Sequence, residues 1–383
     1  MPAFERERAA GAGGRPGGTR LGRVARSIRR VWSDVRREGP GTALRDVQAR
    51  LNKQDFMQFG LLLRIVPWRI RTLSEPRKAE PDGTASPIVL CVVRNGMPWL
   101  RTFLQHHREL GASRFVILDN GSDDDTRRYL AAQEDVLLLA SDAPYRIYEN
   151  TFKRYLADRY GRDRWCLFVD VDELLAYPGM ERRSMAELAA FAQQQGFNAV
   201  VTQMLDLYPD RPIAEVPDGP DEDLRASHRC YETASVERQP YAMAPASVVP
   251  QEARMHVGGV RRRVFGTNQG LTKVSLFRQD GRLRSFHAWH HVSHAEMADF
   301  SVLLLHYPFN RDYRGKMLRT VNEAWQNALW RAEYEGCARG MSENEDLALP
   351  GPDTQRYRGP EPLLDEGFLF ASPAYRAWAA GQD

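Results

Sequence analysis

Cysteine is scarce in this sequence, and long apolar runs are missing. The 383 residues include four cysteines, which lie far apart and form no Cys-x-x-Cys pair. This excludes a disulfide-rich scaffold and the usual zinc spacings, so we expect the cysteines to be core thiols. The longest apolar stretch, residues 59–70, is broken by Arg64, Pro67 and Arg69. It falls short of the roughly 20 apolar residues that a membrane-spanning helix needs.

The N-terminus also lacks the apolar segment of a secretory signal. Its first residues, MPAFERERAAGAGG, are charged and rich in glycine, so we expect a cytoplasmic protein. The composition, 43% hydrophobic and 27% charged, is that of a globular chain. Charge is unevenly distributed along it. Residues 1–80 carry 18 Lys and Arg against 8 Asp and Glu, a net of +10, whereas the rest of the chain carries a net of −7.

The first 80 residues are predicted to have two parts. Residues 1–20 are expected to be disordered, because Gly, Ala and Arg offer little apolar surface. Residues 21–80 are predicted to form a basic helical extension, in which Leu21, Val24 and Ile28 follow a helical spacing between arginines, and to end in a Pro-rich linker. Such a helix packs on the main domain or makes peripheral contact with an anionic membrane at its inner face. Aromatic residues do not alternate with the arginines, so nucleic-acid binding is not expected.

Short apolar runs alternate with helical stretches after this linker. Continuous apolar strands separated by helices are typical of an α/β fold with a mostly parallel sheet and helices on both faces. Ligands of such sheets bind at the carboxyl ends of the strands. The stretch 208–249 is rich in Pro and Asp and is predicted to be a long loop region. The predicted strands are 88–93, 114–118, 136–140, 165–169 and 197–205, and the predicted helices are 99–110, 125–133, 148–160 and 184–195.

The fourth predicted strand runs directly into acidic residues, in the sequence WCLFVDVDELL. Asp170 and Asp172 are separated by one residue, so both side chains project to the same side of a strand end. Two such carboxylates can share one Mg²⁺ or Mn²⁺ ion, whose other ligands are phosphate oxygens and water. A cation held in this way neutralises a diphosphate leaving group. The alternative is a solvated acidic turn.

Polar residues follow the first two strands as well. Asp119 and Asn120 end the second strand and can hydrogen-bond a base or a ribose, and the following Gly121 permits a tight turn. Arg94 and Asn95 leave the first strand just before a helix. All four side chains are expected at the carboxyl edge of the sheet.

Downstream residues offer further candidates. His306 ends the apolar run SVLLLHY and is either a third metal ligand, a diphosphate contact or a core histidine. Arg261 and Lys273 belong to a cationic group that suits diphosphate or an anionic acceptor, or else forms a solvated face. Histidines 287, 290, 291 and 294 would share one face of a helix, but the neighbouring apolar residues favour a strand, and no carboxylate or cysteine completes a zinc site nearby.

Three motifs in this order, VVRNGMPWL, ILDNGSDDDT and FVDVDELL, resemble those of nucleotide-sugar glycosyltransferases of the GT-A fold, in a family 2-like subgroup with a D-V-D-E motif. The resemblance covers about residues 86–335 and implies a Rossmann-like GT-A domain, followed by a tail over 340–383. It implies a metal-dependent hexosyltransferase that uses a nucleoside diphosphate sugar, with Mn²⁺ or Mg²⁺ as cofactor. A glycan or glycolipid acceptor in cell-surface polysaccharide synthesis is expected by analogy.

The resemblance also implies roles for individual residues. Asp119 is expected to contact the nucleobase, with Arg94 and Asn95 beside the nucleoside. Asp170 and Asp172 are expected to form the metal-binding DxD motif. An inverting reaction needs a carboxylate to accept the proton of the acceptor hydroxyl. Asp206 is the leading candidate for this base, and Glu173 and Asp210 are its rivals.

Two other functions remain open from the sequence. FVDVDELL also resembles the strand-DxD motif of haloacid-dehalogenase-type phosphohydrolases, with Asp170 as nucleophile and Asp172 as acid and base. That family carries its motif on the first strand, whereas three strands are predicted before this one. The second alternative is a non-catalytic protein that binds a sugar or nucleotide.

Overall fold

The computed structural model describes most of the chain after residue 60. Residues Met1–Asp55 form a separate unit from Phe56–Asp383, and the expectations for residues 1–20 and for the helix that begins at Leu21 lie outside the described residues. In the part of the chain that the structure describes, no helix has the length and apolar character to cross a membrane. The described residues are 61–80, 86–216, 222–241, 244, 246–286, 290–322, 328–343 and 347–382.

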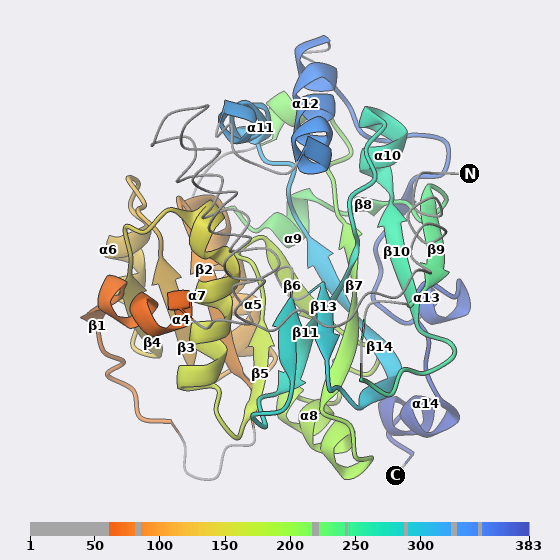
Figure 1. The fold of residues 1–383 in the computed structure, drawn as a ribbon. Coiled ribbons are helices and arrows are strands. Elements are labelled where there is room, and N and C mark those ends of the chain that lie inside the picture. The colour runs from red at the N-terminus through yellow and green to blue at the C-terminus, as the bar shows by residue number, and fades with distance from the viewer. Residues whose placement is uncertain are drawn as a thin grey trace, which may run out of the picture. The chain divides into compact units, whose positions relative to one another are not determined.

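A nine-stranded sheet runs through the middle of the unit, with the strand order β1-β4-β3-β2-β5-β11-β7-β14-β6 (Figure 1). Parallel pairings join β4, β3, β2 and β5 in a row and also join β7 to β14. The predicted α/β fold class, a sheet with parallel strands flanked by helices, is confirmed. The strands are β1 (Arg71–Ser74), β2 (Ile88–Val93), β3 (Phe115–Asp119), β4 (Val136–Ala140), β5 (Trp165–Phe168), β6 (Glu173–Ala176), β7 (Ala199–Asp206), β11 (Thr272–Arg278) and β14 (Met297–His306).

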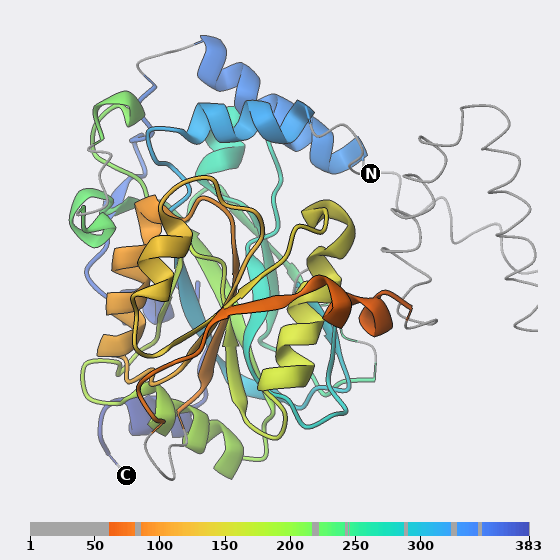
Figure 2. The same ribbon diagram turned by 90° about the vertical axis from the view of Figure 1, so that its left-hand side faces the viewer.

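Helices cover both faces of this sheet because successive strand residues point to opposite sides. In β2, for example, Val89 and Cys91 belong to one core cluster, and Leu90 and Val92 belong to the other. Figure 2 shows α5 and α7 on opposite sides of the sheet. The helices after the first strands are α5 (Met97–Glu109), α6 (Thr126–Ala131), α7 (Tyr145–Tyr160) and α8 (Met185–Gln194), and α4 (Leu61–Ile65) and the 3-10 helix η2 (Val66–Arg69) precede β1.

The second half of the chain adds shorter elements around the sheet. The region predicted as a loop over 208–249 contains η3, α9, β8 and β9, so that prediction was wrong in part. Figure 1 shows α10, α11 and α12 at the top of the view, beyond the end of the sheet where β14 finishes. These elements are η3 (Ile213–Glu215), α9 (Leu224–Ser227), β8 (Cys230–Tyr231), β9 (Val236–Pro240), β10 (Arg254–Gly258), α10 (Val260–Phe265), β12 (Arg284–Phe286), β13 (His291–Ser293), α11 (Tyr313–Asn322) and α12 (Ala328–Glu343).

The last residues of the chain are part of the core rather than an appendage. Tyr375 is fully buried and stacks on Phe300 of β14, with ring centroids 4.0 Å apart. Trp378 packs against the same cluster. The four cysteines are buried free thiols, as expected. The final elements are β15 (Gln355–Arg356), α13 (Pro362–Asp365) and α14 (Pro373–Ala379).

Candidate active site at the carboxyl ends of the strands

The sheet register brings the predicted polar residues to one edge. Val93 of β2 pairs with Asp119 of β3, so the turns that follow these two strands are neighbours. Farther along the sheet, His306 of β14 lies between Asp206 of β7 and Glu173 of β6. Strand pairing alone therefore assembles an acidic and histidine-containing edge.

The turn after β3 is built around the carboxylate of Asp119. Its oxygens accept hydrogen bonds from the backbone N–H groups of Gly121 and Ser122 at 3.2–3.3 Å, and from Nε of Arg127 at 2.5 Å. Gly121 has a φ of +80°, which favours glycine. The Asp119 side chain is fully buried and Arg127 is half-buried. Asp119 therefore shapes the turn, and its oxygens are already used within it.

The neighbouring turns are joined to this one by hydrogen bonds. The backbone N–H of Asn95 donates to Oγ of Ser122 at 2.8 Å, and Oδ1 of Asn95 accepts from the backbone N–H of Asp123 at 3.0 Å. Nδ2 of Asn120 donates to the carbonyls of Ser141 and Ala143, in the loop after β4. Arg94 and Asn95 are exposed to solvent. These two residues are thus placed where a ligand at the strand ends can reach them.

Asp170 lies between two lysines. Its Oδ1 is 3.1 Å from Nζ of Lys153 on α7, and its Oδ2 is 2.8 Å from Nζ of Lys273 on β11. Both lysines are almost fully buried, whereas 31% of the Asp170 side chain is exposed. Burial alone would raise the pKa of Asp170, but the two ammonium groups hold it well below its usual range. Asp170 is therefore a permanently charged carboxylate with a cation on each oxygen.

Glu173 closes the turn that contains the acidic motif. Its Oε2 accepts a hydrogen bond from the backbone N–H of Asp170 at 3.0 Å, and its Oε1 accepts from Nζ of Lys273 at 2.5 Å. Glu173 is 1% exposed. Both oxygens of this carboxylate are therefore engaged in hydrogen bonds inside the turn.

Asp172 and His306 form the second charged group of the site. Oδ2 of Asp172 lies 3.7 Å from Nε2 of His306 and 3.2 Å from Nζ of Lys316 on α11. Burial would raise the pKa of Asp172, but Lys316 and His306 lower it below its usual range. Burial would lower the pKa of His306, but the carboxylates of Asp172 and Asp206 raise it to about 9. In this arrangement His306 is protonated at neutral pH.

Asp206 contacts the ring nitrogen of His306 that faces away from Asp172. Its Oδ1 accepts a hydrogen bond from Nδ1 of His306 at 2.6 Å, and Arg261 donates to Oδ2 from Nε at 2.7 Å and to Oδ1 from Nη2 at 3.2 Å. Burial would raise the pKa of Asp206, but Arg261 and His306 keep it below its usual range. Asp206 is the leading candidate for the catalytic base in the sequence analysis. In the structure both of its oxygens accept hydrogen bonds from His306 and Arg261.

The remaining sequence candidates also have partners. Asp210 is exposed and pairs with Arg356 at 2.8 Å. Arg261 and Lys273, expected to bind diphosphate, are held by Asp206 and by Asp170 with Glu173. The other arginines of α10 are likewise paired, Arg262 with Glu237 and Arg263 with Glu232. The predicted free cationic cluster is therefore charge-balanced.

Of the three histidines near residue 290 that the structure describes, His291 lies in a strand, and His290 and His294 lie in the turns on either side of it. His291 begins β13, and His287 lies outside the described residues. Nδ1 of His290 donates to the carbonyl of Thr272 at 2.8 Å. Burial and the nearby Lys273 lower the pKa of His290 to about 3, so this histidine is neutral.

Sequence reasoning missed several residues that hold the site together. Lys153 lies within the buried side of α7, between Phe152 and Leu156, and a lysine at such a position is itself a signal for a buried ion pair. Lys316 gives no comparable signal. Two buried histidines of α5 fix β6 through one residue: Nε2 of His106 donates to the carbonyl of Leu175 at 2.6 Å, and Nε2 of His107 accepts from its N–H at 3.4 Å.

Two side chains at this edge are arranged so that they could contact one metal ion. Among the described residues, no group of three or more His, Cys, Asp and Glu side chains is arranged to hold one. Asp172 and His306 do present an oxygen and a nitrogen 3.7 Å apart. His306 also has the carboxylate partner on its other ring nitrogen that metal-binding histidines usually have. Once Nε2 of His306 has released its proton, these two side chains fit Mg²⁺ or Mn²⁺, which commonly keep water and substrate phosphates as further ligands.

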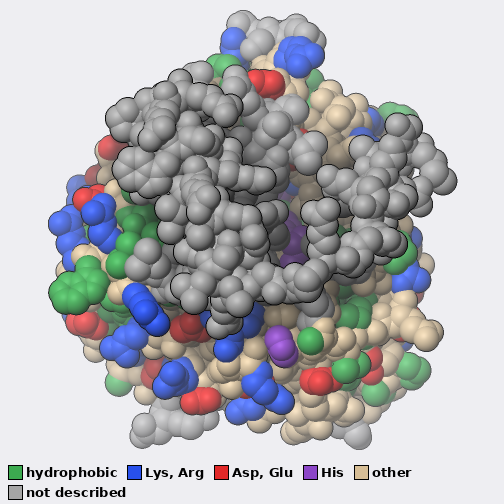
Figure 3. All heavy atoms as spheres, viewed as in Figure 1, with side chains coloured by type: hydrophobic (Ala, Val, Ile, Leu, Met, Phe, Trp, Pro, Cys, Tyr) green, Lys and Arg blue, Asp and Glu red, His purple; other side chains and the backbone are tan. Residues whose placement is uncertain are grey.

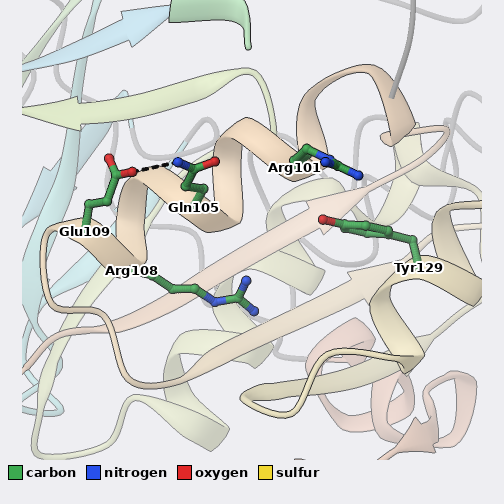
Figure 4. Close-up of a pocket in the computed structure, with 5 residues that line it drawn as sticks. All are labelled: Arg101, Gln105, Arg108, Glu109 and Tyr129. Carbon is green, nitrogen blue, oxygen red and sulfur yellow. Dashed lines mark hydrogen bonds between the residues drawn. The ribbon is translucent and has the colours of Figure 1, made fainter. Parts of the chain in front are cut away.

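A cavity of about 550 Å³ lies elsewhere, on the outer side of α5 beside α6. Figure 4 shows its lining residues, with Gln105 hydrogen-bonded to Glu109. Arg108 binds Asp135 through two nitrogens, and Glu109 binds Arg225. The charged groups of Arg108 and Glu109 are therefore already paired with residues beside the cavity. The lining residues are Arg101, Gln105, Arg108, Glu109 and Tyr129.

The comparisons with known proteins include a distant structural neighbour. No protein-family model matches the sequence, and no curated protein matches it. Among solved structures, the mannosyltransferase PcManGT from Pyrobaculum calidifontis, in complex with GDP-Man and Mn²⁺, is similar over 88% of this chain and 95% of its own. The TM-score is 0.28 and the sequence identity is 13%. A likeness this distant carries no argument about activity.

Proposed function

We propose that the protein is a glycosyltransferase that moves a sugar from a nucleoside diphosphate donor to a glycan or glycolipid acceptor. The observation that carries the proposal is the chain of contacts Asp172–His306–Asp206–Arg261 at the carboxyl edge of the sheet. Ligands of open α/β sheets bind at this edge. The ordered motifs that resemble GT-A glycosyltransferases follow β2, β3 and β5 and end at the same edge.

Asp172 and His306 are the residues that we assign to the divalent cation, Mn²⁺ or Mg²⁺. Bound there, the cation supplies positive charge to the departing diphosphate. Asp206 acts as a positioning residue: its Oδ1 accepts a hydrogen bond from Nδ1–H of His306 and so keeps Nε2 turned toward Asp172. Arg261 holds Asp206 in that orientation through two hydrogen bonds.

Asp170 has a different task in this proposal. Lys153 and Lys273 occupy its two oxygens. We therefore assign Asp170 to contact with the nucleotide sugar and not to binding of the metal ion. Its exposed part is available to a hydroxyl of the donor. Lys316 is the basic side chain that we assign to the diphosphate. Its side chain is 42% exposed, and its Nζ lies next to Asp172, the proposed metal ligand. Arg94 and Asn95 line the nucleoside side.

An inverting reaction needs a base, and each of the three carboxylates that the sequence singled out has partners in this structure. Asp206 and Glu173 have both oxygens engaged, and Asp210 lies exposed with Arg356. A retaining reaction needs no such base. The anomeric configuration of the product, measured by NMR, separates the two courses.

A nucleotide-binding screen tests the proposal. The change in melting temperature is measured with UDP, GDP, TDP, CMP and ADP, each with and without Mn²⁺, on the wild type and on Asp172→Ala. We expect one nucleoside diphosphate to stabilise the wild type in the presence of Mn²⁺ only, and the variant to lose this effect. Asp210→Asn is the matched control, because Asp210 is exposed and pairs with Arg356.

The same screen addresses the two alternatives. Phosphatase activity that disappears in Asp170→Asn, together with no response to any nucleotide, contradicts the proposal and favours the phosphohydrolase. A nucleotide response without turnover of any nucleotide sugar favours the non-catalytic binding protein. Slow hydrolysis of the matching nucleotide sugar to free sugar supports the transferase before the acceptor is identified.

A further inference from the structure

A surface patch of apolar and cationic side chains lies at the start of the described chain, in α4, η2 and β1. We call it the Trp68 patch; its apolar members are Ile65, Trp68 and Leu73. Trp68 is 88% exposed, Ile65 38% and Leu73 41%. They are three of the five large hydrophobic side chains that stand exposed in the described part of the chain. Its cationic members are the exposed arginines Arg64, Arg69 and Arg71.

The backbone under the Trp68 patch is firmly attached to the sheet. Val66 is fully buried in the core cluster on the α7 side. β1 continues the sheet by pairing antiparallel with β4, so that Arg71 lies opposite Ala140. Arg69 forms an ion pair with Asp142 at 3.3 Å. Trp68 therefore projects from an ordered surface, and its exposure is not that of a loose chain end.

The charge of the patch is predominantly positive, although the exposed carboxylate of Asp142 pairs with Arg69. Residues 61–74 contain three arginines and no acidic residue, and residues 1–80 have a net charge of +10. Figure 3 shows hydrophobic side chains beside Lys and Arg side chains at the edge where Figure 1 places α4 and β1. Trp favours the boundary between lipid headgroups and acyl chains, and each Arg near an anionic bilayer is attracted to it.

We propose that the Trp68 patch docks this protein on a membrane surface that contains anionic lipid. Two other occupants of the patch are residues 21–60 of the same chain and a second copy of the chain, and their charge argues against both. Residues 21–60 of the same chain carry nine Lys and Arg against four Asp and Glu, so they have the same sign as the patch. A second copy in a twofold contact would bring the arginines of one patch against those of the other. An anionic bilayer complements both the arginines and the indole ring.

Docking through this patch also suits the position of the proposed active site. Ala140 is the last residue of β4, and Arg71 pairs with it, so the chain enters β1 at the edge where the parallel strands end. The site residues lie at the same edge of the sheet. This step rests on the proposed function: a transferase held in this way has its strand-end site at the membrane side, where a lipid-linked acceptor is found.

Vesicle co-sedimentation of the full chain tests the docking. The probes are phosphatidylcholine vesicles with and without phosphatidylglycerol, at low and high salt. We expect binding to the phosphatidylglycerol vesicles that weakens with salt, and a loss of affinity of about tenfold or more in Trp68→Ser. The matched control is Val248→Ser, because Val248 is 60% exposed but lies outside the patch; it should bind like the wild type.

Fluorescence quenching gives a second, direct measurement. Brominated lipid in the vesicles should quench the emission of the wild type more than that of Trp68→Phe, because Trp68 enters the headgroup region. Three results overturn the proposal: no binding of the wild type to phosphatidylglycerol vesicles, equal binding to vesicles without it, or wild-type binding by Trp68→Ser. The last result assigns the contact to the basic residues before position 61.

Failure of this proposal is distinguishable from failure of the proposed function. Hydrolysis of a soluble nucleotide sugar does not need the membrane, so Trp68→Ser should keep it. A protein that binds vesicles through Trp68 but shows no response to nucleotides supports the docking and contradicts the transferase. The reverse pattern supports the transferase alone.

Discussion

The two acidic turns of the sheet, one after β3 and one after β5, are built in opposite ways. Asp119 bonds to backbone groups two and three residues away and to Arg127, eight residues on. Asp170 and Asp172 bond to Lys273 and Lys316, which lie more than 100 residues later in the chain. The carboxylate of the first turn therefore finds its partners within its own segment. The carboxylates of the second turn obtain these two lysines only when β11 and α11 have packed beside it.

This difference indicates how each turn serves the site. A turn that satisfies its own carboxylate is rigid before any ligand arrives, and it presents backbone atoms and neighbours such as Asn95. A turn whose carboxylates pair with distant lysines holds charges that a ligand can rearrange. We therefore attribute the shape of the donor site to the first turn and its electrostatics to the second.

The largest expected effect comes from Lys273, which joins Asp170 and Glu173. Lys273→Met leaves buried carboxylates without their shared cation and should lower the free energy of unfolding by about 3–5 kcal/mol. Denaturant unfolding measures this. The double variant Lys273→Met/Glu173→Gln should recover part of the loss. A loss under about 1 kcal/mol in the single variant would show that the second turn does not depend on this lysine.

The next effect concerns Asp206, the positioning residue behind His306. Asp206→Asn should reduce the affinity for Mn²⁺, measured with the matching nucleotide present, by about 10–100-fold. Asp210→Asn is the control and should leave the affinity unchanged, because Asp210 pairs only at the surface with Arg211 and Arg356. An unchanged affinity in Asp206→Asn would contradict the role that we assign to Asp206.

Acid should destabilise the folded state by protonating His107, which bonds to β6 directly after the second turn. Its Nδ1 donates to the carbonyl of Phe103 and its Nε2 accepts from Leu175, so the neutral ring is required. Burial lowers its pKa to about 3, against about 6.5 in the unfolded chain. The unfolded state therefore binds more protons between these values, and stability falls as the pH drops below about 6.5, by about 1.4 kcal/mol per pH unit. His107→Gln should flatten this slope in denaturant titrations; an equal slope would be evidence against it.

The smallest effect is expected at the first turn. Asp119→Asn keeps one acceptor oxygen for the backbone N–H groups and loses the charge opposite the half-buried Arg127. The free energy of unfolding should fall by about 1 kcal/mol. Nucleotide preference should not change, because the Asp119 side chain is fully buried. A switch in the preferred nucleotide would instead support the base contact that the family resemblance implies.

The sequence predicted the first half of the fold closely, because its signals are local. The predicted strands 88–93 and 136–140 match β2 and β4 residue for residue, and Ser184 caps α8 with a complete capping box. The apolar runs and turn residues that carry these predictions lie within each segment. β6, directly after the acidic motif, was missed because four residues give no periodicity.

The candidate site was predictable in its acidic residues and unpredictable in their partners. Asp172 and His306 were both named from strand ends, and the register does bring them together. Lys316 lies on a helix with no motif around it, and the use of Asp206 by Arg261 depends on the packing of α10. Such pairs join residues from distant segments, so only the folded sheet reveals them.

The most direct test of this account is to count Mn²⁺ ions by electron paramagnetic resonance in the presence of the stabilising nucleoside diphosphate. The wild type, Asp172→Asn and Asp170→Asn are compared. If Asp172 and His306 hold the cation while Lys153 and Lys273 occupy Asp170, then Asp172→Asn loses bound Mn²⁺ and Asp170→Asn retains it. Retention of Mn²⁺ by Asp172→Asn, or its loss from Asp170→Asn alone, would contradict the account.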